Sequence, residues 1–173
     1  MAKRTFSVDI LSQSSIKQLQ HDLEKYRDSL EYKARLLAET LAERGVEIAR
    51  VQIADLDAIF TGELLESIHS EYVTPQKGGA IFAVVADSGH AIYVEMGTGI
   101  VGAEHPYPGK LPAVYAQGKT IRQLSDGRYG WFYQDKDGNW WFTEGMPSRP
   151  FMYNTAMELM QNVYKTAKEI FGS

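Results

Sequence analysis

The sequence predicts an α+β fold in a single domain spanning residues 1–173. Helical periodicity dominates the regions of about 15–56 and 150–171, whereas aromatic and β-branched runs separated by turn residues occupy about 68–144. Strands are thus segregated from helices along the chain. This order predicts a long N-terminal helical region and a C-terminal helix packed on one face of a small antiparallel sheet, with an inserted aromatic β-hairpin.

The first strongly patterned region is helical. Ser15, with Gln18 three residues later, has the spacing of a capping box and predicts the start of a helix. The alternating segment 6–10 before it predicts a short edge strand. Apolar residues then recur at helical spacing, at Ile16, Leu19, Leu23, Tyr26, Leu30 and Leu37.

The length of this helical region favours two helices. One helix from 15 to 56 would be about 60 Å long at a rise of 1.5 Å per residue, which is too long for a compact domain of this size. We therefore expect a break near Asp28, where Asp28 and Glu31 can cap a second helix.

The middle of the chain predicts a small sheet. Residues 68–74 and 80–87 have strand patterns, and the second, more apolar run is expected to be the central strand. The segment 92–96 predicts one helical turn that Gly97 ends. Three prolines and two glycines between 100 and 112 predict a loop.

Two aromatic runs near residue 135 predict a β-hairpin. Residues 129–133 and 140–143 flank the turn sequence 135–139, which contains Asp-Gly. An amphipathic C-terminal helix follows, with Pro150 as a first-turn residue. Its predicted apolar stripe consists of Met152, Ala156, Leu159, Met160, Val163, Ala167 and Ile170.

Composition excludes several function classes. The net charge is −4 and the basic residues are scattered, so we expect at most passive contact with DNA. The chain has no cysteine, which excludes disulfides and thiolate catalysis and suits a reducing compartment. The longest apolar run, 80–86, is far shorter than the roughly 20 residues of a membrane helix, and we expect neither a membrane span nor a signal peptide.

No catalytic or metal-binding signature is evident. Glu63, Glu66, His69 and Glu71 lie close together in sequence, but their spacing matches no standard ligand pattern. We expect no cofactor, no metal and no enzyme activity. A small hydrolase that uses Glu63 or Glu66 is the weakest alternative.

The aromatic hairpin is a candidate binding surface. Trp131, Tyr133, Trp140 and Trp141 could stack on sugar rings or on a choline headgroup. The string 130–138 is similar to one repeat of the choline-binding, cell-wall-attachment modules. The alternative is a hairpin whose aromatic side covers the domain's own core or a neighbouring subunit.

Glu95 and Arg149 are charged residues inside apolar segments. Because a charge in such surroundings is costly unless it is paired, we hypothesise that the two meet, or that each meets a partner across a subunit boundary. The alternative is that both point into water.

Three segments, in this order, resemble the tail-completion or head–tail joining family of long-tailed siphophages, often labelled gene-product-ten-like. The resemblance runs from about Ala34 to Met160. In place of the family's usual Pro-Val-Asp, the chain has Ala-Ile-Phe at 58–60, and its stretch from 100 to 145 is longer than the family's minimal form. The matching residues are Thr61, Gly62, Leu64, Ser67 and Ile68; Tyr93, Val94, Glu95, Gly97, Thr98 and Gly99; and Arg149, Pro150 and Phe151.

The resemblance implies a structural virion protein, made in the bacterial host cytoplasm, that joins or completes the tail at the head–tail interface. It implies a ring of subunits around the DNA channel, with the connector, tail terminator or tube as partners, although the chain alone can be monomeric. A ring needs two different complementary patches, for which the hairpin and the loop 100–112 are candidates. The candidate interface or motif residues are Thr61, Gly62, Tyr93, Glu95, Gly97, Thr98, Gly99, Trp131, Trp140, Trp141, Arg149, Pro150 and Phe151. The alternative function is a module that binds cell-wall carbohydrate or choline through the hairpin.

Overall fold

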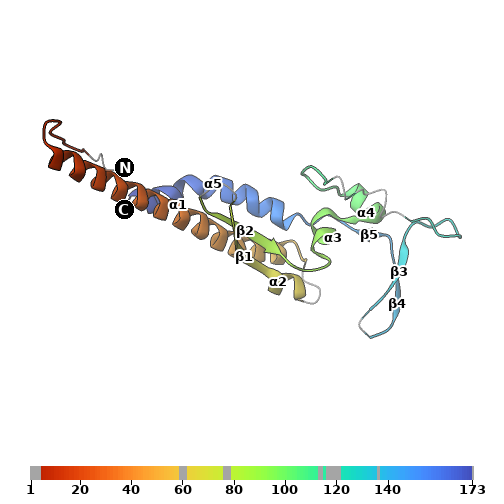
Figure 1. The fold of residues 1–173 in the computed structure, drawn as a ribbon. Coiled ribbons are helices and arrows are strands. Elements are labelled where there is room, and N and C mark those ends of the chain that lie inside the picture. Colours follow the sequence, from red (N-terminus) through yellow and green to blue (C-terminus); the bar gives the residue numbers. More distant parts are fainter. Residues whose placement is uncertain are drawn as a thin grey trace.

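A single long helix organises the fold. The computed structural model describes residues 5–58, 62–75, 79–112, 115, 122–135 and 137–172. Helix α1 (Gln13–Asp55) contacts a two-stranded sheet and the C-terminal helix α5 (Phe151–Gly172). In Figure 1, the N-terminal part of α1 extends beyond these partners, and the aromatic hairpin projects from the opposite end of the molecule.

Helix α1 begins earlier than the predicted capping box. Ser12 is its N-cap residue, and the Ser12 Oγ accepts a hydrogen bond from Ser15 N at 3.3 Å. The edge strand predicted at 6–10 is wrong. This segment contains no strand, and the Phe6 ring lies edge-on to the ring of Tyr26 on α1, with centroids 6.0 Å apart.

The break predicted near Asp28 is also wrong. Helix α1 is continuous over 43 residues, a length of about 64 Å. Arg27 pairs with Asp28 at 3.0 Å and with Glu31 at 3.8 Å, so the expected capping carboxylates bind a side chain of their own helix. The argument from compactness fails because the first half of α1 lies outside the body of the molecule (Figure 1).

The sheet on α1 is a two-stranded antiparallel pair. Strand β1 (Ile68–Val73) pairs with β2 (Ile81–Ala86), with Ile68 opposite Ala86 and Val73 opposite Ile81. Both strands were predicted. The expectation that the second strand is central is wrong for the described residues, among which β2 pairs with β1 alone. Helix α1 contacts both strands.

Helix α5 runs antiparallel to α1, as two contacts show. Near its start, Asn154 Nδ2 donates to Gln52 Oε1 at 3.0 Å, and near its end Glu169 pairs with Arg44 at 3.0 Å. The predicted C-terminal helix is therefore confirmed, and the sheet and α5 both pack on the C-terminal half of α1.

The apolar stripe predicted on this C-terminal helix is wrong in part. Met160 and Val163 are 68% and 41% exposed, whereas Thr155 and Thr166 are buried. The Thr155 hydroxyl donates to the Phe151 carbonyl at 2.7 Å, so its polar atom is satisfied inside the helix and its methyl group can face the core. A prediction based on apolar residues alone misses such positions.

Three short helices connect these elements. Helix α2 (Glu63–Ser67) precedes β1, α3 (Ala91–Met96) follows β2, and α4 (Gly99–Glu104) follows α3. Gly97, with φ of +74°, ends α3 as predicted. The loop prediction for 100–112 is wrong in its first part, which belongs to α4.

The aromatic hairpin has the predicted strands. Strand β3 (Trp131–Gln134) pairs antiparallel with β4 (Trp140–Thr143), and the short β5 (Gly145–Met146) follows. The chain therefore has the expected α+β fold, with long N- and C-terminal helices and small antiparallel sheets. None of the helices in the described ranges is long and apolar enough to cross a bilayer.

Candidate functional site

The three motif segments of the sequence meet in one buried core. The first segment contributes Leu64 and Ile68, the second Ala91 and Val94, and the third Phe151. Ile68 and Phe151 have no exposed surface. From α1 and its end, Ala49, Ile53 and Ala58 complete this core. These five apolar residues of the motifs are therefore accounted for by packing within one chain.

Backbone pairing joins the second and third segments. Thr98 pairs with Met146 and Gly99 with Gly145 in isolated antiparallel bridges, and Met146 N donates to Thr98 Oγ1 at 3.2 Å. A Cβ atom on Gly145 would lie 2.0 Å from Thr98 O, and φ there is +112°. Only glycine therefore permits this close approach without strain.

Glu95 caps the start of α5 from a distant part of the chain. Its Oε2 accepts from Met152 N and its Oε1 from Tyr153 N, both at 2.9 Å. These are the amide groups that an N-cap side chain would normally bind, and Pro150 at the cap has no side-chain acceptor. The negative charge also lies at the positive end of the helix dipole. Glu95 is thus a surrogate cap.

The Glu95 carboxyl group is buried. The residue is 6% exposed, and burial raises the pKa of its carboxyl group. Hydrogen bonds from Met152 N, Tyr153 N and the Tyr107 side chain oppose that rise in pKa, because they favour the charged form.

Arg149 acts at the end of the other long helix. Its Nε donates to the carbonyl of Leu56, the C-cap residue of α1, at 3.0 Å, and its backbone N donates to Val94 O at 2.9 Å. The last turn of α1 contains no basic residue, so Arg149 supplies the cation that the negative end of the helix dipole favours.

The hypothesis that Glu95 and Arg149 meet is therefore wrong. Each binds a helix end of opposite polarity, and no ion pair joins them. The alternative that both point into water is also wrong for Glu95, which is buried. The underlying premise holds, since a buried charge here is compensated by hydrogen bonds and helix dipoles.

The end of α1 contains a strained residue. Asp57 has φ of +49°. The Asp57 amide donates to Ala54 O at 3.1 Å and the Ala58 amide to Ile53 O at 2.9 Å, which is the hydrogen-bond pattern of a Schellman motif. Glycine usually occupies this left-handed position, so the aspartate here carries a conformational cost.

The hairpin presents aromatic side chains to solvent. Trp140 is 67% exposed, Trp141 54% and Phe132 51%. At its turn, Asp135 accepts from Trp141 Nε1 at 2.7 Å and from Asn139 N at 2.8 Å, and these bonds lower the pKa of Asp135. Within this chain the exposed rings do not cover the core, so one of the alternatives for the hairpin is removed.

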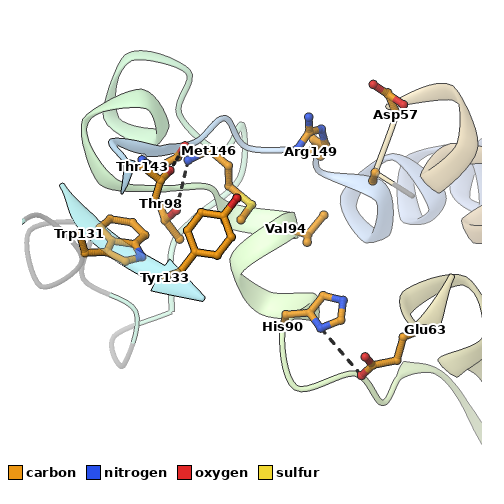
Figure 2. A pocket seen from close by; sticks show the side chains of 12 residues that line it. Asp57, Glu63, His90, Val94, Thr98, Trp131, Tyr133, Thr143, Met146 and Arg149 are labelled. Carbon is orange, nitrogen blue, oxygen red and sulfur yellow. Dashed lines mark hydrogen bonds and ion pairs between the residues drawn. The ribbon is translucent and has the colours of Figure 1, made fainter. Parts of the chain in front are cut away.

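A cavity of about 630 Å³ lies between the hairpin, α3 and the end of α1. Figure 2 shows Trp131 and Tyr133 on the hairpin side, with His90 and Glu63 across from them. Glu63 Oε1 is 3.9 Å from His90 Nδ1. The full lining is Asp57, Ala58, Glu63, His90, Val94, Thr98, Trp131, Tyr133, Thr143, Gly145, Met146 and Arg149.

The lining contains groups that can bind a ligand. Two aromatic rings and two carboxylates can hold a cationic or hydroxyl-rich ligand. Glu63 and His69, which lie close together in sequence, have different partners, since Glu63 contacts Ser88 and His90 while His69 Nδ1 lies 2.9 Å from the carbonyl of Ser67. Among the described residues no group of three or more His, Asp or Glu side chains could hold a metal ion.

The remaining predicted residues have distinct places. Gly62 is the N-cap of α2 with φ of +84°. Pro150 occupies the N-cap of α5, where its carbonyl accepts from Asn154 N at 2.9 Å. The Tyr93 ring is 45% exposed and lies against that of Tyr115. Thr61 lies outside the described residues.

Two tyrosines that support this region were missed by the sequence prediction. Tyr115 is buried and its hydroxyl donates to Gly97 O, and the Tyr107 hydroxyl binds Glu95. Both lie in the long stretch after Ile100. The proline-rich sequence around Tyr107 predicts only a loop, and no spacing rule links either tyrosine to its acceptor.

The comparisons with known proteins add no assignment. No family model matches the chain, and the searches of curated proteins and of solved structures found no match.

Proposed function

We propose that this protein is a structural virion component of a bacteriophage or prophage that joins or completes the tail at the head–tail interface. The observation that carries the proposal is the collinear set of three motifs, whose members lie together in the core formed by Leu64, Ile68, Ala91, Val94 and Phe151. This shared core gives the motif residues a packing role, which supports a structural function.

Exposed apolar surface supports a role in protein contact. The aromatic hairpin leaves Phe132, Trp140 and Trp141 more than half exposed at one end of the molecule. Aromatic residues of this kind are enriched in the centres of protein interfaces. We propose that the hairpin contacts a neighbouring subunit or another neck or tail protein in a ring around the DNA channel.

Deletion of the gene in a phage that encodes it tests the proposal. We expect separate heads and tails, or incomplete tails, in electron micrographs of the lysate, and complete particles after complementation with the wild-type chain. Infectious particles with complete tails in the absence of the gene would exclude this role.

The same complementation locates the contact. A chain with Trp140→Ser is expected to fold but to give few complete particles. Tyr32→Ser is the matched control, because Tyr32 is an aromatic residue 66% exposed on α1, far from the hairpin. Equal rescue by both variants would remove the hairpin from the proposed interface.

A second candidate function rests on the cavity. Trp131 and Tyr133 line it together with Asp57 and Glu63, a combination that would suit a choline headgroup or a cell-wall sugar. Retention on choline resin, lost in Trp131→Ala and kept in Trp140→Ala, would favour this binding module over the neck protein. Trp140 does not line the cavity.

A further inference from the structure

The half of α1 that extends beyond the body has a heptad pattern. Ile16, Leu23 and Leu30 lie seven residues apart, and Leu19 and Tyr26 lie three residues after the first two. In heptad notation these are consecutive a and d positions from 16 to 30. Such a 3-4 spacing is the pattern with which helices pair as coiled coils.

The a positions of this seam are open to solvent in the single chain, whereas the d positions Leu19 and Tyr26 are half-buried. Ile16, Leu23 and Leu30 are 39%, 45% and 37% exposed. Helix α5 does not reach them, because Glu169, close to its end, pairs with Arg44. The segment before α1 contacts the d side, where Phe6 stacks on Tyr26, and leaves the a positions exposed.

The charged residues beside the seam favour pairing with a second copy of this chain. Asp22 occupies a g position and Arg27 the following e position. In a parallel coiled coil, a g residue contacts the e residue five positions later on the other helix, so Asp22 of each copy would meet Arg27 of the other, twice per dimer. To make this contact, Arg27 would give up its exposed ion pairs with Asp28 and Glu31 of its own helix, which contribute little to stability.

The residues just before α1 also favour parallel pairing with a second copy. Ile10 and Leu11, directly before the first turn, are 78% and 93% exposed. Parallel association would bring the two tips together and cover these side chains, whereas antiparallel association would place them at opposite ends.

We propose that residues 16–30 of α1 form a parallel coiled coil with a second copy of this chain. The apolar seam supplies the contact, and both charges that fix its direction are on the chain itself. The proposal does not depend on the role in a phage neck. It assigns a self-association surface at the end of the molecule opposite the hairpin.

Sedimentation equilibrium of the full chain over a wide concentration range tests association. We expect a mass above the 19.5 kDa monomer that falls on dilution. Leu23→Glu should raise the dissociation constant by at least about tenfold, since it buries an unpaired carboxylate at an a position. His21→Glu is the matched control, because it adds the same charge at an outward f position and should leave association unchanged.

Circular dichroism shows whether Leu23→Glu changes the fold of the chain as well as its association. Leu23 lies outside the core, so the helicity of the variant at low concentration should equal that of the wild type. A wild-type chain that stays monomeric throughout, or a control variant that weakens association as much as Leu23→Glu does, would overturn the proposal.

The absence of cysteine in the chain permits a direct test of direction. Leu11→Cys alone should form disulfide dimers under mild oxidation if the helices are parallel, and Leu23→Glu in the same chain should abolish them. Cross-linking that requires a mixture of Leu11→Cys and Ala34→Cys chains would show antiparallel pairing and refute the proposed geometry.

Discussion

Removal of the Glu95 carboxylate should destabilise the protein through the start of α5. Glu95→Ala leaves the amides of Met152 and Tyr153 without their acceptors in a partly buried position. An unsatisfied buried donor costs about 1–3 kcal/mol, and loss of an N-cap costs about 0.5–2 kcal/mol. Since these two descriptions overlap, we expect a total loss of about 2–4 kcal/mol.

Glu95→Gln separates the hydrogen bonds from the charge. The amide oxygen of glutamine can accept from one of the two helix amides, so near neutral pH we expect a loss of about 1 kcal/mol or less. The order of stability should therefore be wild type, then glutamine, then alanine.

Urea unfolding followed by far-UV circular dichroism measures both losses. For a chain of this length, 3 kcal/mol corresponds to a decrease in Tm of about 6–12 °C. Glu144→Gln is the matched control, because Glu144 is an exposed residue whose substitution should change little. If Glu95→Ala lies within about 0.5 kcal/mol of the wild type, the capping argument is wrong.

Four further outcomes follow from the geometry of Glu95, Gly145, Arg149 and Asp57. Because burial raises the pKa of Glu95 in the folded state, the proton-linked part of its stabilisation is full below the unfolded pKa of about 4.3 and is lost as pH rises through the folded value, whereas its hydrogen bonds to the helix amides remain. The stability advantage over Glu95→Gln should therefore shrink from acid to neutral pH; a constant difference in a urea–pH series would contradict this. Gly145→Ala should cost more than about 2 kcal/mol in the same unfolding assay, whereas Gly127→Ala, with a positive φ but no neighbouring atom within 4 Å, should cost only about 1 kcal/mol. In a double-mutant cycle, the effects of Glu95→Gln and Arg149→Gln on stability should be additive within about 0.5 kcal/mol because the side chains bind different helices; coupling above about 1 kcal/mol would refute that assignment. Asp57→Gly should raise stability by about 0.5–1 kcal/mol because glycine tolerates the left-handed conformation, and a less stable glycine variant would refute the assignment of strain at Asp57.

Secondary-structure elements whose signal lies in residues close together in the sequence were predictable. The two strands of the sheet, the hairpin around Asp135 and the helix that begins at Phe151 all appear within a few residues of their expected bounds. Each has a local signal, either a period of side chains or a turn sequence, that acts within one element.

Predictions that assumed a tertiary relation were less successful. The break near Asp28 was inferred from the size of a compact domain, and the structure instead leaves half of α1 outside the body. The pairing of Glu95 with Arg149 was inferred from charge, whereas helix ends supply the partners of both. Thr155 and Thr166 are buried although the predicted apolar stripe did not include them, whereas its members Met160 and Val163 are exposed.

By itself, the sequence determined the kinds of element, their order and the need to compensate a charge at Glu95 and at Arg149. The tertiary structure decided what compensates them, because the amides at the start of α5 and the carbonyl at the end of α1 become available only after distant segments have packed together. Every helix end has backbone amide or carbonyl groups without partners inside the helix, so the sequence of that helix does not indicate which distant side chain will bind them.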